Sequence, residues 1–128
     1  TADPAVSAAL VRHAEKAGGP LASGITVSSP GFYGPSSRYI EGLVNTVPAI
    51  KGTLAKLDVD GRQVLNMEME SSLLFHLAAA LGHRAGTICP AISQPGSQAA
   101  LVDYDACIED AISVALAAMI ELHDGHDR

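Results

Sequence analysis

Aromatic residues are scarce in this chain of 128 residues: they make up 4% of it, and tryptophan is absent. Apolar residues nevertheless reach 48%, and alanine accounts for much of that share. This composition favours close packing of helices on a sheet over a core built from large rings. With 17% charged residues, the chain has the composition of a globular protein, and its length predicts one domain at most.

Basic residues are also few, with 8 against 14 acidic ones and a net charge of −6. This charge repels phosphate backbones and no basic cluster interrupts it, so we expect no nucleic-acid partner. No apolar run reaches the ~18 residues that would predict a membrane span. The first residues, Thr-Ala-Asp-Pro, are typical of a helix start and not of a signal peptide. The missing initiator Met favours a fragment or a processed chain.

The only two cysteines, Cys89 and Cys107, lie within apolar segments and lack the spacing of a metal site. We expect buried thiols of a cytoplasmic protein. No set of Cys, His and Asp has the spacing of a zinc site or of an activated nucleophile, so no metal is expected. A glycine-rich phosphate loop is absent as well.

Turn formers and apolar periodicity divide the chain into alternating helices and strands. A helix is predicted from Asp3-Pro4 to the stop at Gly18-Gly19-Pro20, and a last helix from about Asp103. Further helices are predicted at about 48–58 and over Glu70–Leu81, the latter with Gly82 as its C-cap. Strands are predicted at 22–29, over Val64–Met69 and at 84–93, the last of them apolar on both faces. Four leucines are expected to face inward from the third helix: Leu73, Leu74, Leu77 and Leu81. One apolar face is expected on the last helix: Ile108, Ile112, Ala115, Met119 and Leu122.

This alternation predicts an α/β sheet with helices on its faces. Three short strands form a poor free-standing sheet, so either a missing part of the same polypeptide or another chain should cover them.

The most unusual local string is Asn66-Met67-Glu68-Met69-Glu70-Ser71-Ser72, at the passage from a strand to a helix. On an extended backbone, Glu68 and Glu70 would point to the same side. Such a pair could accept hydrogen bonds from sugar hydroxyls, bind a metal or act in acid/base chemistry. Alternatively, Glu70 only stabilises the helix start and Glu68 is solvated.

A second group of interest is the loop 30–37, directly after a predicted strand, with Phe32, Tyr33 and, just beyond it, Arg38. An aromatic face and a guanidinium suit a planar heterocycle, by stacking and by donation to a carbonyl. The alternative is a hydrophobic loop anchor beside a surface arginine.

Taken together, the strings SSPGFYGPSSRY, NMEMESS and LLFHLAAALGHRAGTIC resemble the uridine phosphorylase branch of the nucleoside phosphorylase family. The resemblance spans nearly the whole chain. It implies an α/β, three-layer phosphorylase-type fold with a mixed sheet flanked by helices, of which residues 1–128 would form only the carboxy-terminal half. It also implies a homo-oligomer, and inorganic phosphate as co-substrate with no other cofactor.

The resemblance implies reversible phosphorolysis of a nucleoside, in which phosphate displaces the base from the sugar. Phe32 would pack against the base, and Arg38 would stabilise charge on the departing base. Met69 and Glu70 would hold the ribose, with Arg38 and Glu70 as the catalytic residues. Three further positions would shape the pocket: Glu68 on its ribose side, and Ile92 and Ser93 on its base side.

Two departures from the family pattern leave open which base the site would bind. Ser36 stands in the base-binding loop where uridine-active members usually have Gln, and Gln94-Pro95 stands where they usually have Asn-Arg. The phosphate-binding amino-terminal half is missing, so we expect this chain alone to be inactive and to need that half as a separate or cleaved chain. The alternatives are a degenerate or repurposed homologue that binds a nucleoside-like ligand, an enzyme acting on an unusual nucleoside, and a nucleosidase that uses water.

Overall fold

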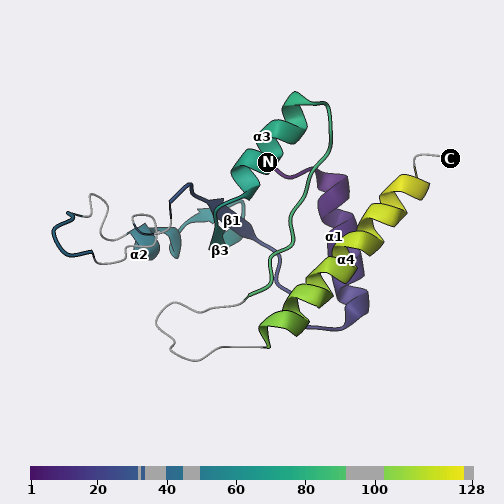
Figure 1. Cartoon of the computed structure of the whole chain (residues 1–128), viewed down its shortest axis with the longest axis horizontal. Coiled ribbons are helices and arrows are strands. Elements are labelled where there is room, and N and C mark those ends of the chain that lie inside the picture. Colours follow the sequence, from purple (N-terminus) through teal and green to yellow (C-terminus); the bar gives the residue numbers. More distant parts are fainter. Residues whose placement is uncertain (32, 34–39, 45–49, 92–102, 126–128) are drawn as a thin grey trace. The chain divides into compact units, whose positions relative to one another are not determined.

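The computed structural model describes residues 1–31, 33, 40–44, 50–91 and 103–125 (Figure 1). Four helices and three strands occur there: α1 (Pro4–Ala17), β1 (Ile25–Ser28), α2 (Ile50–Leu54), β2 (Asp58–Val59), β3 (Arg62–Glu68), α3 (Ser71–Ala80) and α4 (Tyr104–Asp124). The chain forms two compact units, one of Thr1–Leu21 with Phe75–Arg128 and one of Ala22–Leu74. No helix in the described part of the chain is long and apolar enough to cross a membrane.

Helices α1 and α4 pack against each other in the first unit. Asp3 caps α1 by accepting hydrogen bonds from the N–H groups of Ala5 and Val6, and Gly18 ends it with a left-handed φ of 78°. Both ends agree with the sequence prediction. The buried core between the helices consists of small and aliphatic side chains: Ala9, Leu10, Ala14, Val114 and Ala118. Three alanines in this set let the two backbones approach closely.

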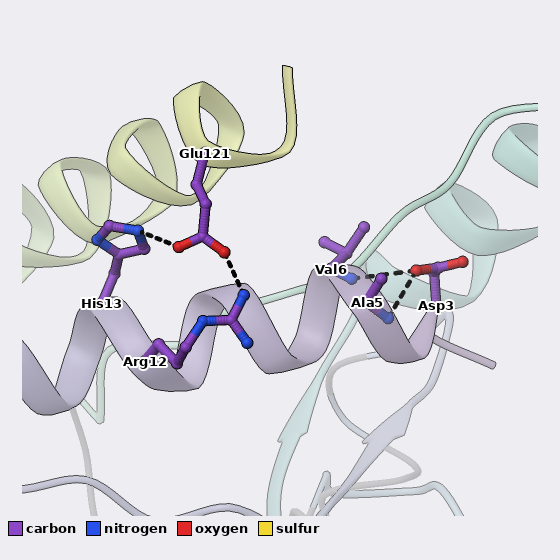
Figure 2. A network of polar contacts seen from close by, with 6 residues as sticks. All are labelled: Asp3, Ala5, Val6, Arg12, His13 and Glu121. Carbon is purple, nitrogen blue, oxygen red and sulfur yellow. Dashed lines mark hydrogen bonds and ion pairs between the residues drawn. The ribbon is translucent and has the colours of Figure 1, made fainter. Parts of the chain in front are cut away.

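A polar network also joins α1 to α4 (Figure 2). The Glu121 carboxylate accepts from the guanidinium of Arg12 through one oxygen, and its other oxygen lies 3.0 Å from Nε2 of His13. The Arg12 hydrogen bond is the largest influence on the Glu121 pKa, which it lowers together with His13 against a smaller opposing effect of burial. The network lies beside the apolar core and adds a charge-dependent contact to it.

The second unit contains a mixed three-stranded sheet in the order β1-β3-β2. Strands β1 and β3 are parallel, with Ser28 opposite Glu68, and the register is irregular between Ile25 and Thr26. Gly24 precedes this irregularity, and a Cβ there would lie 2.6 Å from the Leu65 side chain. The α/β class and the mixed sheet are thus confirmed, whereas the three-layer arrangement stays a prediction.

The antiparallel hairpin of β2 and β3 was not predicted from the sequence. Its turn is Asp60-Gly61, and both residues have positive φ, 55° and 75°, as a type I′ turn requires. Asp58 supports the turn by accepting a hydrogen bond from the N–H of Gly61 through Oδ1 at 2.9 Å. The Asp-Gly pair is a recognised hairpin signal, hidden here because β2 is only two residues long. Helix α2 (Ile50–Leu54) ends before the predicted end at residue 58, and residues 48–49 lie outside the described residues.

Helix α3 ends as predicted at Gly82, which has a φ of 73°. The N–H groups of Gly82 and His83 donate to the carbonyls of Ala79 and Ala78, the pattern of a Schellman cap. The predicted burial of this helix is wrong, however, because all four leucines expected to face inward are exposed: Leu73, Leu74, Leu77 and Leu81. The less exposed positions of α3 are Ser71, Phe75 and Ala78, so the apolar periodicity did not identify the inner face.

The predicted strand at 84–93 is not found, since residues 84–91 form no strand and 92–93 lie outside the described residues. The apolar run does pack: Ile88 contacts the α1–α4 core, and the N–H of Asp3 donates to the carbonyl of Ala85. A strand also requires a neighbouring strand to pair with. The unit that contains this segment has no strand among its described residues.

The apolar face predicted for the last helix is also partly wrong. In α4, Val114 and Ala118 are buried, and Ala115 and Leu122 pack partly buried against the core. Ile112 and Met119, expected on the inner face, are exposed. Helix α4 therefore has a second apolar stripe at helical spacing, made of four exposed residues: Ile112, Leu116, Met119 and Ile120.

Candidate functional site

The ends of two parallel strands bring two of the predicted site segments to one sheet edge. Because β1 and β3 are parallel neighbours and Ser28 pairs with Glu68, both strands end at the same edge. The N–H of Ser29 continues the ladder by donating to the Glu68 carbonyl at 3.0 Å. The chain after β1 leads into loop 30–37, and the chain after β3 is Met69-Glu70. Such an edge is a common place for ligand sites in α/β proteins.

The Glu68 carboxylate caps the beginning of α3. Its Oε2 accepts hydrogen bonds from the N–H groups of Glu70 at 2.8 Å and Ser71 at 2.7 Å, and its Oε1 accepts from the Ser71 hydroxyl at 2.6 Å. Ser71 is the one buried polar residue recorded for the described chain, at 4% exposure. The first N–H groups of a helix lack partners within it, so the carboxylate supplies acceptors where the helix needs them.

The same contacts set the charge state of Glu68. Partial burial acts to raise its pKa, but the hydrogen bonds from Ser71, Glu70 and Ser28 together outweigh burial and lower the pKa below 4.5. Glu68 is therefore a carboxylate at neutral pH. The expectation that Glu68 is merely solvated is wrong.

Glu70 has a different environment. Strand β3 ends at Glu68, so the alternation expected to place Glu68 and Glu70 on the same side does not extend to Glu70. The Glu70 side chain is exposed, and its Oε2 accepts from the N–H of Met69 at 3.1 Å. Met69 is also exposed. These two residues form the bend between β3 and α3 and leave a carboxylate available to a ligand.

Two serines take part in this arrangement that the sequence analysis did not single out. The Ser28 hydroxyl accepts from the N–H of Ser72 at 3.1 Å, which links the end of β1 to the first turn of α3. Ser71 links that turn to Glu68. A serine at a helix start is a recognised capping signal, and it could have identified Ser71. Ser28 had no such signal, because its partner lies far away in the sequence.

The remaining predicted site residues lie outside the described residues: Phe32, Ser36, Arg38, Ile92 and Ser93. Their assignments stay predictions. Cys89 and Cys107 are unpaired and half-buried. In the described ranges, no three His, Cys, Asp or Glu side chains gather where they could hold a metal ion. A hollow of about 280 Å³ in the other unit, lined in part by Asp3, Phe75 and His83, contains no predicted site residue.

A family model described as the phosphorylase superfamily matches residues 1–122. Among individual proteins, the uridine phosphorylase of Klebsiella aerogenes is 36% identical over 91 residues, which cover 71% of this chain and 35% of that protein. The uridine phosphorylase of Escherichia coli (strain K12) is 35% identical over the same shares. That of Thermococcus kodakarensis is 38% identical over 88 residues, or 69% of this chain and 31% of that protein.

The chain thus spans about a third of the length of these curated relatives. No solved structure matches it significantly. The family match extends over almost the whole chain, including β1, β3, α3 and the bend with Met69 and Glu70. From this match and the identities above, the chain belongs to the phosphorylase superfamily.

Proposed function

We propose that this chain supplies the ribose and base side of a nucleoside phosphorylase site that acts on a uridine-like nucleoside. The observation that supports it best is the pairing of Ser28 with Glu68 in parallel strands. Because of this pairing, loop 30–37 and the Met69-Glu70 bend both begin at the same sheet edge. A base held by the first segment and a sugar held by the second would then be neighbours, as the two halves of a nucleoside are.

In the proposed reaction, an oxygen of inorganic phosphate attacks the anomeric carbon of the sugar. The bond from that carbon to the base nitrogen breaks, its electron pair leaves with the base, and the base then takes up the proton that the phosphate loses. The products are the free base and ribose 1-phosphate. The exposed Glu70 carboxylate accepts from ribose hydroxyls beside Met69, with Glu68 shaping this side. Positive charge develops on the sugar and negative charge on the base in the transition state, and the protein can accelerate the reaction by stabilising both.

On the base side, the proposal assigns packing to Phe32 and charge stabilisation to Arg38, whose guanidinium can donate to a base carbonyl. Ser36, Ile92 and Ser93 complete that side. No cofactor or metal is required, because phosphate is the nucleophile and the base departs as a stabilised anion.

The proposed site also requires phosphate ligands that this chain does not supply, since its sequence has no glycine-rich phosphate loop. We propose that an amino-terminal half, as a separate or cleaved chain, completes the domain. The exposed apolar stripes of α3 and α4 support this, because such surfaces are costly in water. Family membership supports assembly as a homo-oligomer, and the two unpaired cysteines support a cytoplasmic location.

A second candidate is a homologue that binds nucleoside-like ligands without turning them over. Ser36 favours it, because its side chain is too short to make the paired contacts of an amide with a pyrimidine edge. Pro95 changes the same side of the pocket. A nucleosidase, with water in place of phosphate, is the third possibility.

The experiment is an intact-mass measurement of every polypeptide in the purified protein, followed by assays with uridine in the presence and absence of phosphate. We expect a second polypeptide and phosphate-dependent release of uracil, and no release from this chain alone. Release without phosphate would identify a nucleosidase. Binding of nucleosides without turnover of any of them would identify the binding homologue and exclude the proposed reaction.

A further inference from the structure

Glu68 and Glu70 are two residues apart, yet their carboxylates have different tasks in the structure. Three hydrogen bonds are donated to Glu68, two by backbone N–H groups and one by the Ser71 hydroxyl. A carboxylate has about four lone-pair sites, so most of the acceptor capacity of Glu68 is already used. Glu70 receives one hydrogen bond from the described residues, through Oε2. A sugar hydroxyl would therefore find more free acceptor sites at Glu70 than at Glu68.

The contacts of Glu68 also fix the bend that contains Glu70. Glu68 accepts from the N–H of Glu70 itself, and Ser71 on the other side of the bend is held by both oxygens of Glu68. The Ser28 hydroxyl accepts from Ser72 in the same turn, and Ser29 donates to the Glu68 carbonyl. The bend is thus anchored before and after Met69-Glu70, and to the end of β1.

From these contacts we infer that Glu68 is a positioning residue, which holds Met69 and Glu70 in the conformation that binds ribose without touching the sugar itself. The inference rests on the proposed function and divides the tasks within it: Glu70 contacts the substrate, and Glu68 acts through Glu70. Pre-organisation of this kind matters because a misplaced contact group loses much of its contribution to binding and rate.

The charge of Glu68 supports this division. Its lowered pKa keeps the Glu68 carboxylate ionised at neutral pH. The hydrogen bonds that it accepts from Glu70 and Ser71 are therefore retained at this pH. Replacing Glu68 by Gln leaves one carbonyl oxygen to accept from the two N–H groups and removes the charge. The substitution therefore weakens the hydrogen bonds at the start of α3 and changes the size of the side chain little.

The test is a double-mutant cycle of Glu68→Gln and Glu70→Gln, measured as the dissociation constants for uridine and for ribose 1-phosphate. The sample is the purified protein with any polypeptide that copurifies with it. We expect Glu70→Gln to raise the dissociation constant about 10–100-fold, as for the loss of a charged hydrogen bond. Glu68→Gln should raise it about 3–10-fold alone and by a clearly smaller factor once Glu70 is Gln, when only Met69 remains to be positioned. Glu121→Gln, the same change in the other unit, is the control and should leave both constants unchanged.

A second readout needs no ligand. The amide resonances of Glu70 and Ser71 should shift together with the titration of Glu68 at a pH below 4.5, and this titration should disappear in Glu68→Gln. If Glu68→Gln does not fold, Ser71→Ala replaces it in the cycle.

Additive effects of the two substitutions would show that Glu68 contacts the sugar directly and would overturn the inference, with the proposed function intact. Amide resonances that do not follow the Glu68 titration would overturn it as well. If the wild-type protein binds neither probe, the proposed function itself fails, and the positioning role falls with it.

Discussion

A single residue decides how closely the segment after α3 can approach helix α1 in the first unit. This residue is Gly86, because a Cβ there would lie 2.7 Å from Cγ1 of Val6 and 3.2 Å from Cδ1 of Leu10. Val6 has a stiff, β-branched side chain that cannot easily yield. Two residues later, Ile88 packs against the α1–α4 core. The segment after α3 therefore depends on a glycine to reach this core.

We predict that Gly86→Ala lowers the free energy of unfolding by about 1–3 kcal/mol, as overpacked substitutions do. Urea unfolding followed by circular dichroism measures the change. Gly19→Ala is the matched control in the same unit, since a Cβ at Gly19 meets nothing within 4 Å. Adding Val6→Ala to Gly86→Ala should cost less than the sum of the two separate changes. Equal stabilities of Gly86→Ala and Gly19→Ala would contradict the close approach.

At the scale of elements, the contact between α1 and α4 combines an apolar core with the Glu121 network. Arg12 foremost, together with His13, lowers the Glu121 pKa below 4.5. A carboxyl whose pKa is lower in the folded than in the unfolded state stabilises the fold above the unfolded value. This contribution is lost as the pH falls through the folded value. The network should therefore act at neutral pH and fade in acid.

Accordingly, Glu121→Gln should lower Tm slightly at pH 7, with a difference from the wild type that shrinks as the pH falls below 4.5. Thermal melts from pH 7 to pH 3 measure it. Glu15→Gln, an exposed acid of α1 outside the network, is the control and should follow the wild type. A difference that stays constant over this pH range would show that the Glu121 charge does not link the helices.

At the scale of the whole molecule, many large apolar side chains of α3 and α4 are exposed. The α4 stripe Ile112, Leu116, Met119 and Ile120 lies away from the buried Val114 and Ala118. The curated relatives are about three times as long as the matched region, and the completing polypeptide proposed above would be a cover for this stripe.

We predict that the double substitution Leu116→Lys and Met119→Lys abolishes association with the proposed completing polypeptide, because two charges would have to be buried. The stability of the isolated chain should change by less than about 0.5 kcal/mol, since both side chains are exposed. Copurification and urea unfolding measure the two effects. Asp110→Lys changes the net charge by the same amount from another side of α4 and should associate normally. Normal association of the double variant would place the interface elsewhere.

The sequence by itself determined what depends on a few neighbouring residues. Asp3 and Gly18 set the ends of α1, Gly82 ends α3, and the β-branched residues around Ile25 and Val64 mark two strands. These signals act within one or two turns of chain, so they can be interpreted without knowing the fold. The strings SSPGFYGPSSRY, NMEMESS and LLFHLAAALGHRAGTIC together also indicate the family, because the resemblance depends on residue types and their order along the chain.

Only the tertiary structure decided what depends on distant partners. The leucines of α3 and the stripe of α4 have helical periodicity, but burial needs a covering surface, which the described chain does not supply. Residues 84–91 have the apolar pattern of a strand and no strand to pair with in their unit. Ser28 and Ser72 are 44 residues apart, and only the β1–β3 pairing brings the Ser28 hydroxyl to the N–H of Ser72 in the first turn of α3. Hydrogen-bond pairing and burial are properties of contacts between segments, so periodicity along one segment cannot determine them.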